Sequence, residues 1–184
     1  MRVRHQLVAI FVVVVVALGG AACGSSKKSS APPAAPATAA SPSVNDAACA
    51  STDRKSFAKA RFVANAGLAA GAFHRYIYKP LKAGGFKQGA DKRKRTFVKA
   101  AVAAVFVVNR LNAAKEDARG DPTLCRYAAS LSQGFENLKN KLHGGTATPA
   151  DVDSGENGFT ALRQQAGRDG AGFSDQNVPV PGAS

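Results

Sequence analysis

Apolar residues between positions 51 and 166 recur three and four places apart, the spacing that puts side chains on one face of an α-helix. Ser51 or Thr52 offers an N-cap, and the helix breaker Pro80 follows the first such stretch. We therefore expect a first helix from Ser51 or Thr52 to just before Pro80. Gly67 and Gly71, four places apart among alanines, indicate that a neighbouring helix packs closely against it. The apolar positions of this helix are Phe62, Ala66, Ala69, Phe73 and Ile77.

Two further helices are predicted after a glycine-containing turn over 80–89. The second is expected over 91–119, and its centre, 100–108, is apolar on every side, which indicates a buried, central helix. Those nine residues are too few to cross a bilayer. The third is expected over 122–143, between Asp121-Pro122 and Gly144-Gly145, which are start and stop signals. Its apolar stripe is Leu124, Ala128, Leu131, Phe135, Leu138 and Leu142.

The segment 149–166 has the weakest helical pattern. Val152, Phe159 and Leu162 keep the helical register, but Gly155 and Gly158 lie inside it. The segment is therefore either a short fourth helix or no helix. Residues 167–184 have the composition of a disordered tail.

The helices predict an all-α fold. Short connections between amphipathic helices favour antiparallel neighbours, so residues 46–145 are expected to form an up-down-up three-helix bundle. Residues 146–184 are expected to be the weak helix and the disordered tail, and the fourth helix, if it forms, folds back onto the bundle.

The first 22 residues are predicted to be a signal peptide. Arg2 and Arg4 precede an apolar run over 7–18, and small residues follow it, the order of a secretory signal. The run is shorter than the roughly 20 residues of a permanent membrane helix. Residues 25–45, rich in Ser, Ala and Pro, predict a disordered linker, in which Lys27 and Lys28 would lie near anionic lipid headgroups.

The junction Gly19-Gly20-Ala21-Ala22-Cys23-Gly24 resembles the lipobox of bacterial lipoproteins. The resemblance implies that Cys23 is acylated and becomes the first residue of the mature chain. The Cys-Gly-Ser-Ser sequence at this point looks like lipoproteins of high-GC Gram-positive bacteria; the body of the chain resembles no characterised family. The expected location is the extracytoplasmic face of the cell membrane, with secretion as the alternative.

With Cys23 assigned to lipid, Cys49 and Cys125 remain as an even pair in an oxidising compartment, which predicts one disulfide. The topology supports the pairing, because the start of the first helix and the first turn of the third lie together in an up-down-up bundle. Two unpaired buried thiols are the alternative. Two distant cysteines and two histidines after the signal form no metal-ligand cluster, so neither a metal nor a cofactor is expected.

The chain is strongly basic, with 25 Lys and Arg against 12 Asp and Glu. A basic protein meets anions, and export argues against nucleic acid as the partner. The expected topology gathers cations at the pole opposite the disulfide, and the run 92–95 places four of them where they oppose the helix dipole, which indicates an anion ligand. That ligand would be a lipid headgroup, a wall polymer or an acidic protein. The candidate anion-binding residues are Arg75, Lys79, Lys92, Arg93, Lys94 and Arg95.

Two plainer interpretations of this pole stay open. The cations form a solvated face, or acidic residues at the start of the fourth segment neutralise them from within the chain. Those acidic residues are Asp151, Asp153 and Glu156.

His74, Tyr76 and Tyr78 lie in the densest polar and aromatic stretch and are candidates to line a small pocket. A packed, hydrogen-bonded histidine is the alternative. The S-x-x-K pattern at 56–59 lacks the K-T-G that accompanies it in penicillin-recognising enzymes, and the acidic run 151–156 lacks the glycine position of a calcium loop. Without a catalytic constellation, a non-enzymatic protein is expected.

Three functions are therefore considered. The first is a binding or scaffolding module whose basic pole meets an anionic envelope component. The second is a protein-interaction or dimerisation module that uses an apolar helix face. The third is a small-ligand carrier or enzyme with a pocket near His74.

Overall fold

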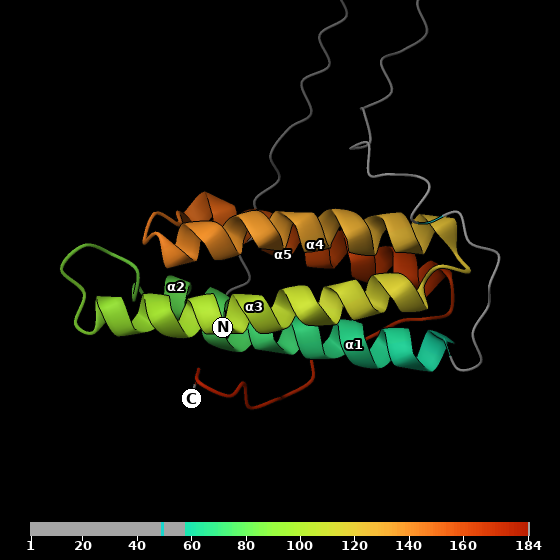
Figure 1. Ribbon diagram of the computed structural model, residues 1–184, viewed down its shortest axis with the longest axis horizontal. Coiled ribbons are helices and arrows are strands. Elements are labelled where there is room, and N and C mark those ends of the chain that lie inside the picture. Colours follow the sequence, from blue (N-terminus) through green and yellow to red (C-terminus); the bar gives the residue numbers. More distant parts are fainter. Residues whose placement is uncertain (1–48, 50–57, 184) are drawn as a thin grey trace, which may run out of the picture. The chain divides into compact units, whose positions relative to one another are not determined.

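The computed structural model describes Cys49 and residues 58–183. The signal peptide, Cys23, the linker and the start of the first helix lie outside these residues. The described part is helical, with no strand in it, which confirms the all-α prediction (Figure 1). Its elements are α1 (Ala58–Phe73), the π-helical turn η2 (His74–Tyr78), α2 (Lys79–Lys82), α3 (Arg93–Asp117), α4 (Pro122–His143) and α5 (Pro149–Arg168).

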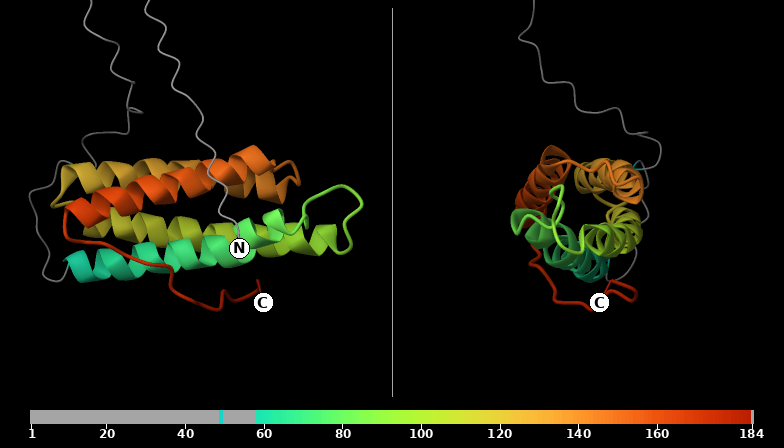
Figure 2. Two further views of the ribbon diagram at one scale, coloured as in Figure 1. Left: turned by 180° about the vertical axis from the view of Figure 1, so that it is seen from behind. Right: turned by 90° about the vertical axis from the view of Figure 1, so that its left-hand side faces the viewer.

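Four long helices pack together around one apolar core. α3 contacts both α1 and α4, α4 contacts α5, and α5 reaches back to η2 (Figures 1 and 2). At the centre, the ring of Phe73 on α1 lies 5.2 Å from that of Phe135 on α4 and 5.4 Å from that of Phe159 on α5. Aromatic pairs at such distances add to the stability from burial alone. All three rings are fully buried, so three helices meet at one aromatic cluster.

The fourth helix, left open by the sequence, is a full 20-residue helix. Its start is fixed by a capping box, in which the Thr148 hydroxyl accepts from the Asp151 backbone and the Asp151 carboxylate accepts from the Thr148 backbone. The two glycines inside it are close-approach positions. A Cβ at Gly155 would lie 3.1 Å from Phe135 Cζ, and one at Gly158 would lie 2.5 Å from Leu131 Cδ1. The glycines that weaken the local pattern therefore let α5 pack tightly on α4.

The expectation that the first helix ends before Pro80 is wrong. After α1 the chain makes one π-helical turn and continues as α2 through Pro80 to Lys82. Proline cannot donate a backbone hydrogen bond and disturbs the preceding turn. Here the wider turn accommodates it, because the backbone N–H of Lys79 donates to the carbonyl of His74, five residues back.

α3 is less completely buried than its apolar centre predicts. It is buried where it meets α1 and α4, but Val105 is 40% exposed and Val102 is half-buried. Among the described helices, α3 is long and apolar enough to cross a membrane, and half of its apolar stretch is buried in the structure. Core helices of soluble proteins meet the same criterion, so this finding alone assigns no span.

The segment 169–183, expected to be part of a disordered tail, follows a defined path across the outer side of α1 (Figure 2). We call it the C-terminal strap. The backbone N–H of Gln176 donates to the carbonyl of Gly67 at 3.0 Å, and Val180 and Ala183 are each 1% exposed. A Cβ on Gly71 would lie 1.8 Å from the carbonyl oxygen of Gln176. The two glycines thus make room for the strap instead of for a helix.

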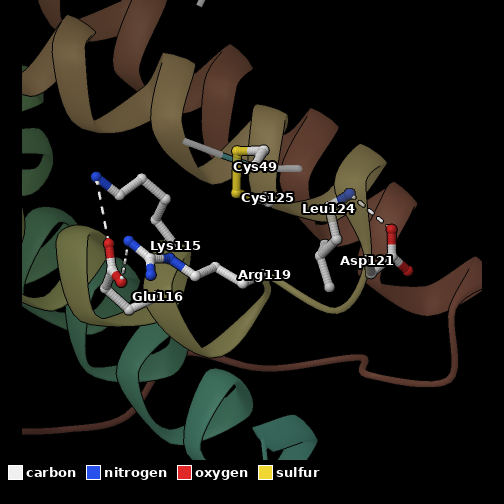
Figure 3. Close-up of a disulfide and its surroundings, with 7 residues drawn as sticks. All are labelled: Cys49, Lys115, Glu116, Arg119, Asp121, Leu124 and Cys125. Atoms are coloured by element: carbon white, nitrogen blue, oxygen red, sulfur yellow. Dashed lines mark hydrogen bonds and ion pairs between the residues drawn. A yellow bond between two sulfur atoms is a disulfide. The ribbon is translucent and has the colours of Figure 1, made fainter. Parts of the chain in front are cut away.

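The predicted disulfide is present. Cys49 and Cys125, 76 residues apart in sequence, have Cα atoms 5.7 Å apart, and both are buried (Figure 3). Cys125 lies in the first turn of α4, so the disulfide ties the segment before α1 to that end of the bundle. Figure 3 also shows the ion pairs and the helix cap nearby, formed by Lys115, Glu116, Arg119, Asp121 and Leu124.

Candidate functional site

We call the segment 86–99 the basic tip. It lies at the end of the bundle where α4 ends, opposite the disulfide near the start of α4. It includes the loop before α3 and the first turns of that helix, which reach beyond the adjacent ends of α4 and α5 (Figures 1 and 2). Six of its residues are basic and one, Asp91, is acidic. The basic residues are Lys87, Lys92, Arg93, Lys94, Arg95 and Lys99.

An aromatic and cationic stack holds the tip in shape. The rings of Phe86 and Phe97 meet edge to face at 4.8 Å, and the Arg93 guanidinium lies 4.7 Å above the Phe97 ring. Arg93 Nε also donates to the Phe86 carbonyl at 3.1 Å. One of the six cations therefore has a structural role and joins the loop to the helix.

The other five cations have no acidic partner within the described chain. Four are exposed and one, Lys99, is half-buried, and no ion pair joins any of the five to a described carboxylate. The exposed four are Lys87, Lys92, Lys94 and Arg95. α3 has no acidic residue in its first turn, and Lys92, at its N-cap position, has a left-handed φ of 62° and makes no side-chain cap. The charges and the dipole at the start of the helix therefore add to the same positive potential.

The acidic residues of α5 neutralise other parts of this end of the bundle. Asp151 pairs with Lys141 of α4 at 2.5 Å, and Asp153 pairs with Lys82 of α2 at 3.1 Å. The hydrogen bond from Lys141 lowers the pKa of Asp151 to about 2, with help from Thr148, and the hydrogen bond to Asp153 raises the pKa of Lys82. Internal neutralisation thus reaches α2 and α4, and it does not reach the basic tip.

The six predicted anion-binding residues do not form one cluster. The four of the run 92–95 lie in the basic tip, and Lys79 is exposed on α2. Arg75 lies on the strap side, where its guanidinium donates to the Asn177 side chain and lies 5.4 Å from the Tyr76 ring centroid. Arg75 therefore helps to hold the strap.

His74 is the centre of a charged cluster that sequence reasoning missed. Its Nε2 lies 2.5 Å from a carboxylate oxygen of Glu156 on α5, and its Nδ1 contacts a carboxylate oxygen of Asp175 on the strap. Arg163, also on α5, donates to the other oxygen of Asp175. We call these four residues the His74 cluster. Glu156 and Asp175 are 82 and 101 residues from His74 in sequence, so no local pattern connects them.

The two tyrosines expected beside His74 in a pocket take separate partners. The Tyr76 hydroxyl accepts from the backbone N–H of Val180 at 3.3 Å, whereas the Tyr78 ring packs 5.5 Å from the imidazole of His74 and 5.9 Å from Phe73. Tyr76 therefore serves the strap, and Tyr78 serves the core. The alternative of a packed, hydrogen-bonded His74 describes these contacts.

A groove of about 400 Å³ runs beside the basic tip, between α3 and the end of α4. Cationic or titratable side chains and apolar side chains share its walls, and its lining includes Arg93, Lys94, Phe97, Val98, Val102, Leu142 and His143. The volume lies within the range of roughly 300–1,000 Å³ typical of ligand sites.

The chain matches no protein-family model, no curated protein and no solved structure.

Proposed function

We propose that the chain is a non-enzymatic envelope lipoprotein, anchored through an acylated Cys23, whose basic tip binds an anionic envelope component. The single observation that carries the proposal is the unpaired charge of the tip. The described chain holds enough acid to pair with Lys82, Lys141 and His74, yet leaves four exposed cations of the tip without a carboxylate.

The energetics of α3 support this function. A cation in the first turn of a helix costs about 0.3–1 kcal/mol of stability through the helix dipole. Three cations occupy that turn, Arg93, Lys94 and Arg95, and the carboxylate of Asp91 pairs with none of them. An external anion would relieve the repulsion between these cations. Backbone N–H groups at the start of a helix can also donate hydrogen bonds to such an anion.

The anchor and the topology fit together in this proposal. The four helices form an antiparallel bundle, joined by short connections, with the disulfide at one end and the basic tip at the other. A disordered linker over 25–45, which the composition predicts, would let the tip turn towards the membrane that holds Cys23, at about 3 Å per extended residue. Lipid headgroups and wall polymers are both within reach of such a tether.

A vesicle-binding experiment tests the function. The mature chain with Cys23→Ser would be mixed with vesicles of phosphatidylglycerol and phosphatidylcholine, or of phosphatidylcholine alone, over a range of salt concentrations. We expect binding to the anionic vesicles only, weakening as salt rises. Soluble polyglycerol phosphate, an anion without an acyl phase, would be tested in parallel.

A matched pair of variants locates the binding. Replacing Lys94 and Arg95 with Gln removes two charges from the tip, and replacing Arg61 and Arg168 with Gln removes two exposed charges from helix positions elsewhere. Each cation near an anionic surface contributes about 1 kcal/mol, so the tip variant should bind roughly 10- to 30-fold more weakly. Equal loss in the two variants would show that only net charge matters and would reject the tip as the site.

The anchor has its own test. Cys23→Ala should move the protein from the membrane fraction to the soluble fraction after a high-salt wash, and should abolish labelling by a palmitate analogue. Unchanged labelling would reject acylation at Cys23.

A further inference from the structure

Exposed large apolar side chains are few in the described chain, and they are concentrated on α3. Val98 is 61% exposed, Val105 is 40% exposed, and the third, Tyr127 of α4, is 41% exposed. Val102, half-buried, lies between the two valines, at spacings of four and three residues. These spacings place Val98, Val102 and Val105 on one side of the helix, which we call the valine face.

The valine face continues directly into the basic tip. Lys94 lies four residues before Val98 and Arg95 lies three before it, so both cations neighbour this valine on the helix surface. The groove between α3 and α4 repeats this order, with Arg93 and Lys94 followed along α3 by Val98 and Val102. Cations at one end and apolar side chains at the other match the layering of a bilayer, in which charged headgroups overlie acyl chains.

The rest of the structure leaves this side of α3 open. α1 and α4 pack on other sides of the helix, and the end of the strap only borders it, since a Cβ on Gly182 would lie 3.5 Å from Val102 Cγ1. Exposed apolar side chains gathered on one surface mark an interaction site more often than single ones do. Within the described residues, nothing covers Val98.

We propose that the valine face inserts into the surface of an anionic bilayer, so that α3 lies against the membrane with the cations of the tip among the headgroups. The inference rests on the proposed function, and it identifies the anionic component as the lipid headgroups of a bilayer. A soluble polymer satisfies the cations but offers no apolar phase to Val98 and Val105. A second copy of this chain would bring two sets of unpaired cations together, which electrostatic repulsion opposes.

The absence of tryptophan from the chain gives a direct test. Val98→Trp places a single tryptophan at the centre of the proposed contact, and Tyr127→Trp places one at an exposed site on α4 as the matched control. With anionic vesicles, we expect the emission of Val98→Trp to shift to the blue and to be quenched by brominated acyl chains. The emission of Tyr127→Trp should not change.

A second pair of variants measures the contribution of the face to binding. Both positions are exposed, so Val98→Asp and Tyr127→Asp should fold and melt close to the unmodified chain. We expect Val98→Asp to bind anionic vesicles at least about tenfold more weakly, and Tyr127→Asp to lose much less, since a single carboxylate away from the contact acts only through long-range repulsion.

The outcomes separate this inference from the function on which it rests. If Lys94→Gln with Arg95→Gln weakens vesicle binding but Val98→Trp shows neither shift nor quenching, the tip binds headgroups and insertion is rejected. If the chain binds polyglycerol phosphate and not vesicles, the anionic function stands and the bilayer is rejected. If it binds neither, both proposals fail.

Discussion

The basic tip and the His74 cluster differ in whether their charged side chains have partners within the described chain. In the His74 cluster, two carboxylates from α5 and the strap meet one imidazole and one guanidinium, so each carboxylate has a hydrogen-bonding partner within the described chain. In the tip, six basic residues share one acidic residue and make no ion pair within the described chain. The two regions differ because the acidic residues of α5 and the strap face η2, α2 and α4, and not the start of α3. Paired charge joins elements of this structure, and the unpaired charge of the tip is the part that we propose to bind an anion.

The His74 cluster joins three elements of the fold. Both ring nitrogens of His74, on η2, face carboxylate oxygens, one from Glu156 of α5 and one from Asp175 of the strap. Arg163 of α5 donates to the other oxygen of Asp175. These contacts tie η2, α5 and the strap together.

Displacing the strap from α1 should cause the largest loss of stability, because the His74 cluster includes a residue of the strap. Gly71→Ala places a Cβ at 1.8 Å from the Gln176 carbonyl oxygen, so the strap must move and its contacts to His74 weaken. We expect unfolding free energy to fall by about 2 kcal/mol, as in other overpacked sites. Thermal melts would measure the loss, and faster hydrogen exchange at the Gln176 amide would locate it.

Gly134→Ala is the matched control for this change. A Cβ at Gly134, exposed in the middle of α4, meets nothing within 4 Å. Alanine there should stabilise the helix by about 0.5–1 kcal/mol. If both variants melted alike, the strap would not be seated on the α1 glycines.

Acid should remove the pairing that α5 provides to α4. The hydrogen bond from Lys141 holds the pKa of Asp151 at about 2, below its ordinary value of 3.8. A lowered pKa stabilises the folded state above the unfolded value, so this contribution is lost as the pH falls from about 4 to about 2. After allowance for solvent screening, the loss should be about 1 kcal/mol.

Asp151→Asn isolates this contribution. The variant should be less stable than the unmodified chain at pH 7, and the difference should shrink between pH 4 and pH 2 in urea unfolding curves. A difference that stayed constant over this range would mean that the contribution of Asp151 to stability does not depend on the charge of its carboxylate.

Single carboxylates on the two sides should contribute unequally. Asp175→Asn removes the acceptor charge shared by His74 and Arg163, and we expect a loss of about 1 kcal/mol at this partly exposed site. Asp91→Asn, in the tip, should change stability by less than about 0.5 kcal/mol. Chemical denaturation at neutral pH compares the two, and equal losses would contradict the distinction between the regions.

The smallest effect has the opposite sign. Lys94→Glu and Arg95→Glu should each raise stability by about 0.3–1 kcal/mol, because acidic residues suit the first turn of α3. The same variants should lose affinity for anionic vesicles. Lys115→Glu, in the last turn of the same helix, should lower stability and serves as the control. A tip variant that destabilised the fold would show that these cations have a structural role.

Sequence reasoning succeeded where the signals are local. The helix predicted over 122–143 has these bounds in the structure, because Asp121 caps it and Pro122 opens it. The run 92–95 was likewise recognisable as a cationic helix start from its composition alone. In both cases the responsible residues lie within a few positions of each other.

The errors arise where distant segments meet. Gly155 and Gly158 weaken a helix locally, but their lack of a side chain lets α5 approach Phe135 and Leu131 closely. Gly67 and Gly71 correctly signalled a close neighbour, yet nothing in the sequence identifies that neighbour as a strap about 105 residues later. The His74 cluster was unpredictable for the same reason, since its carboxylates come from α5 and the strap.

Because the strap follows α1 by about 100 residues, α1 is synthesised well before the segment that covers it. A ribosome adds about 5–20 residues per second, so on the order of 5–20 seconds separate the appearance of Gly71 from that of Gln176. Throughout that interval the outer side of α1 lacks the cover that the strap provides. A chain interrupted before the strap is made lacks this cover, and its uncovered α1 distinguishes it from a chain that carries the strap.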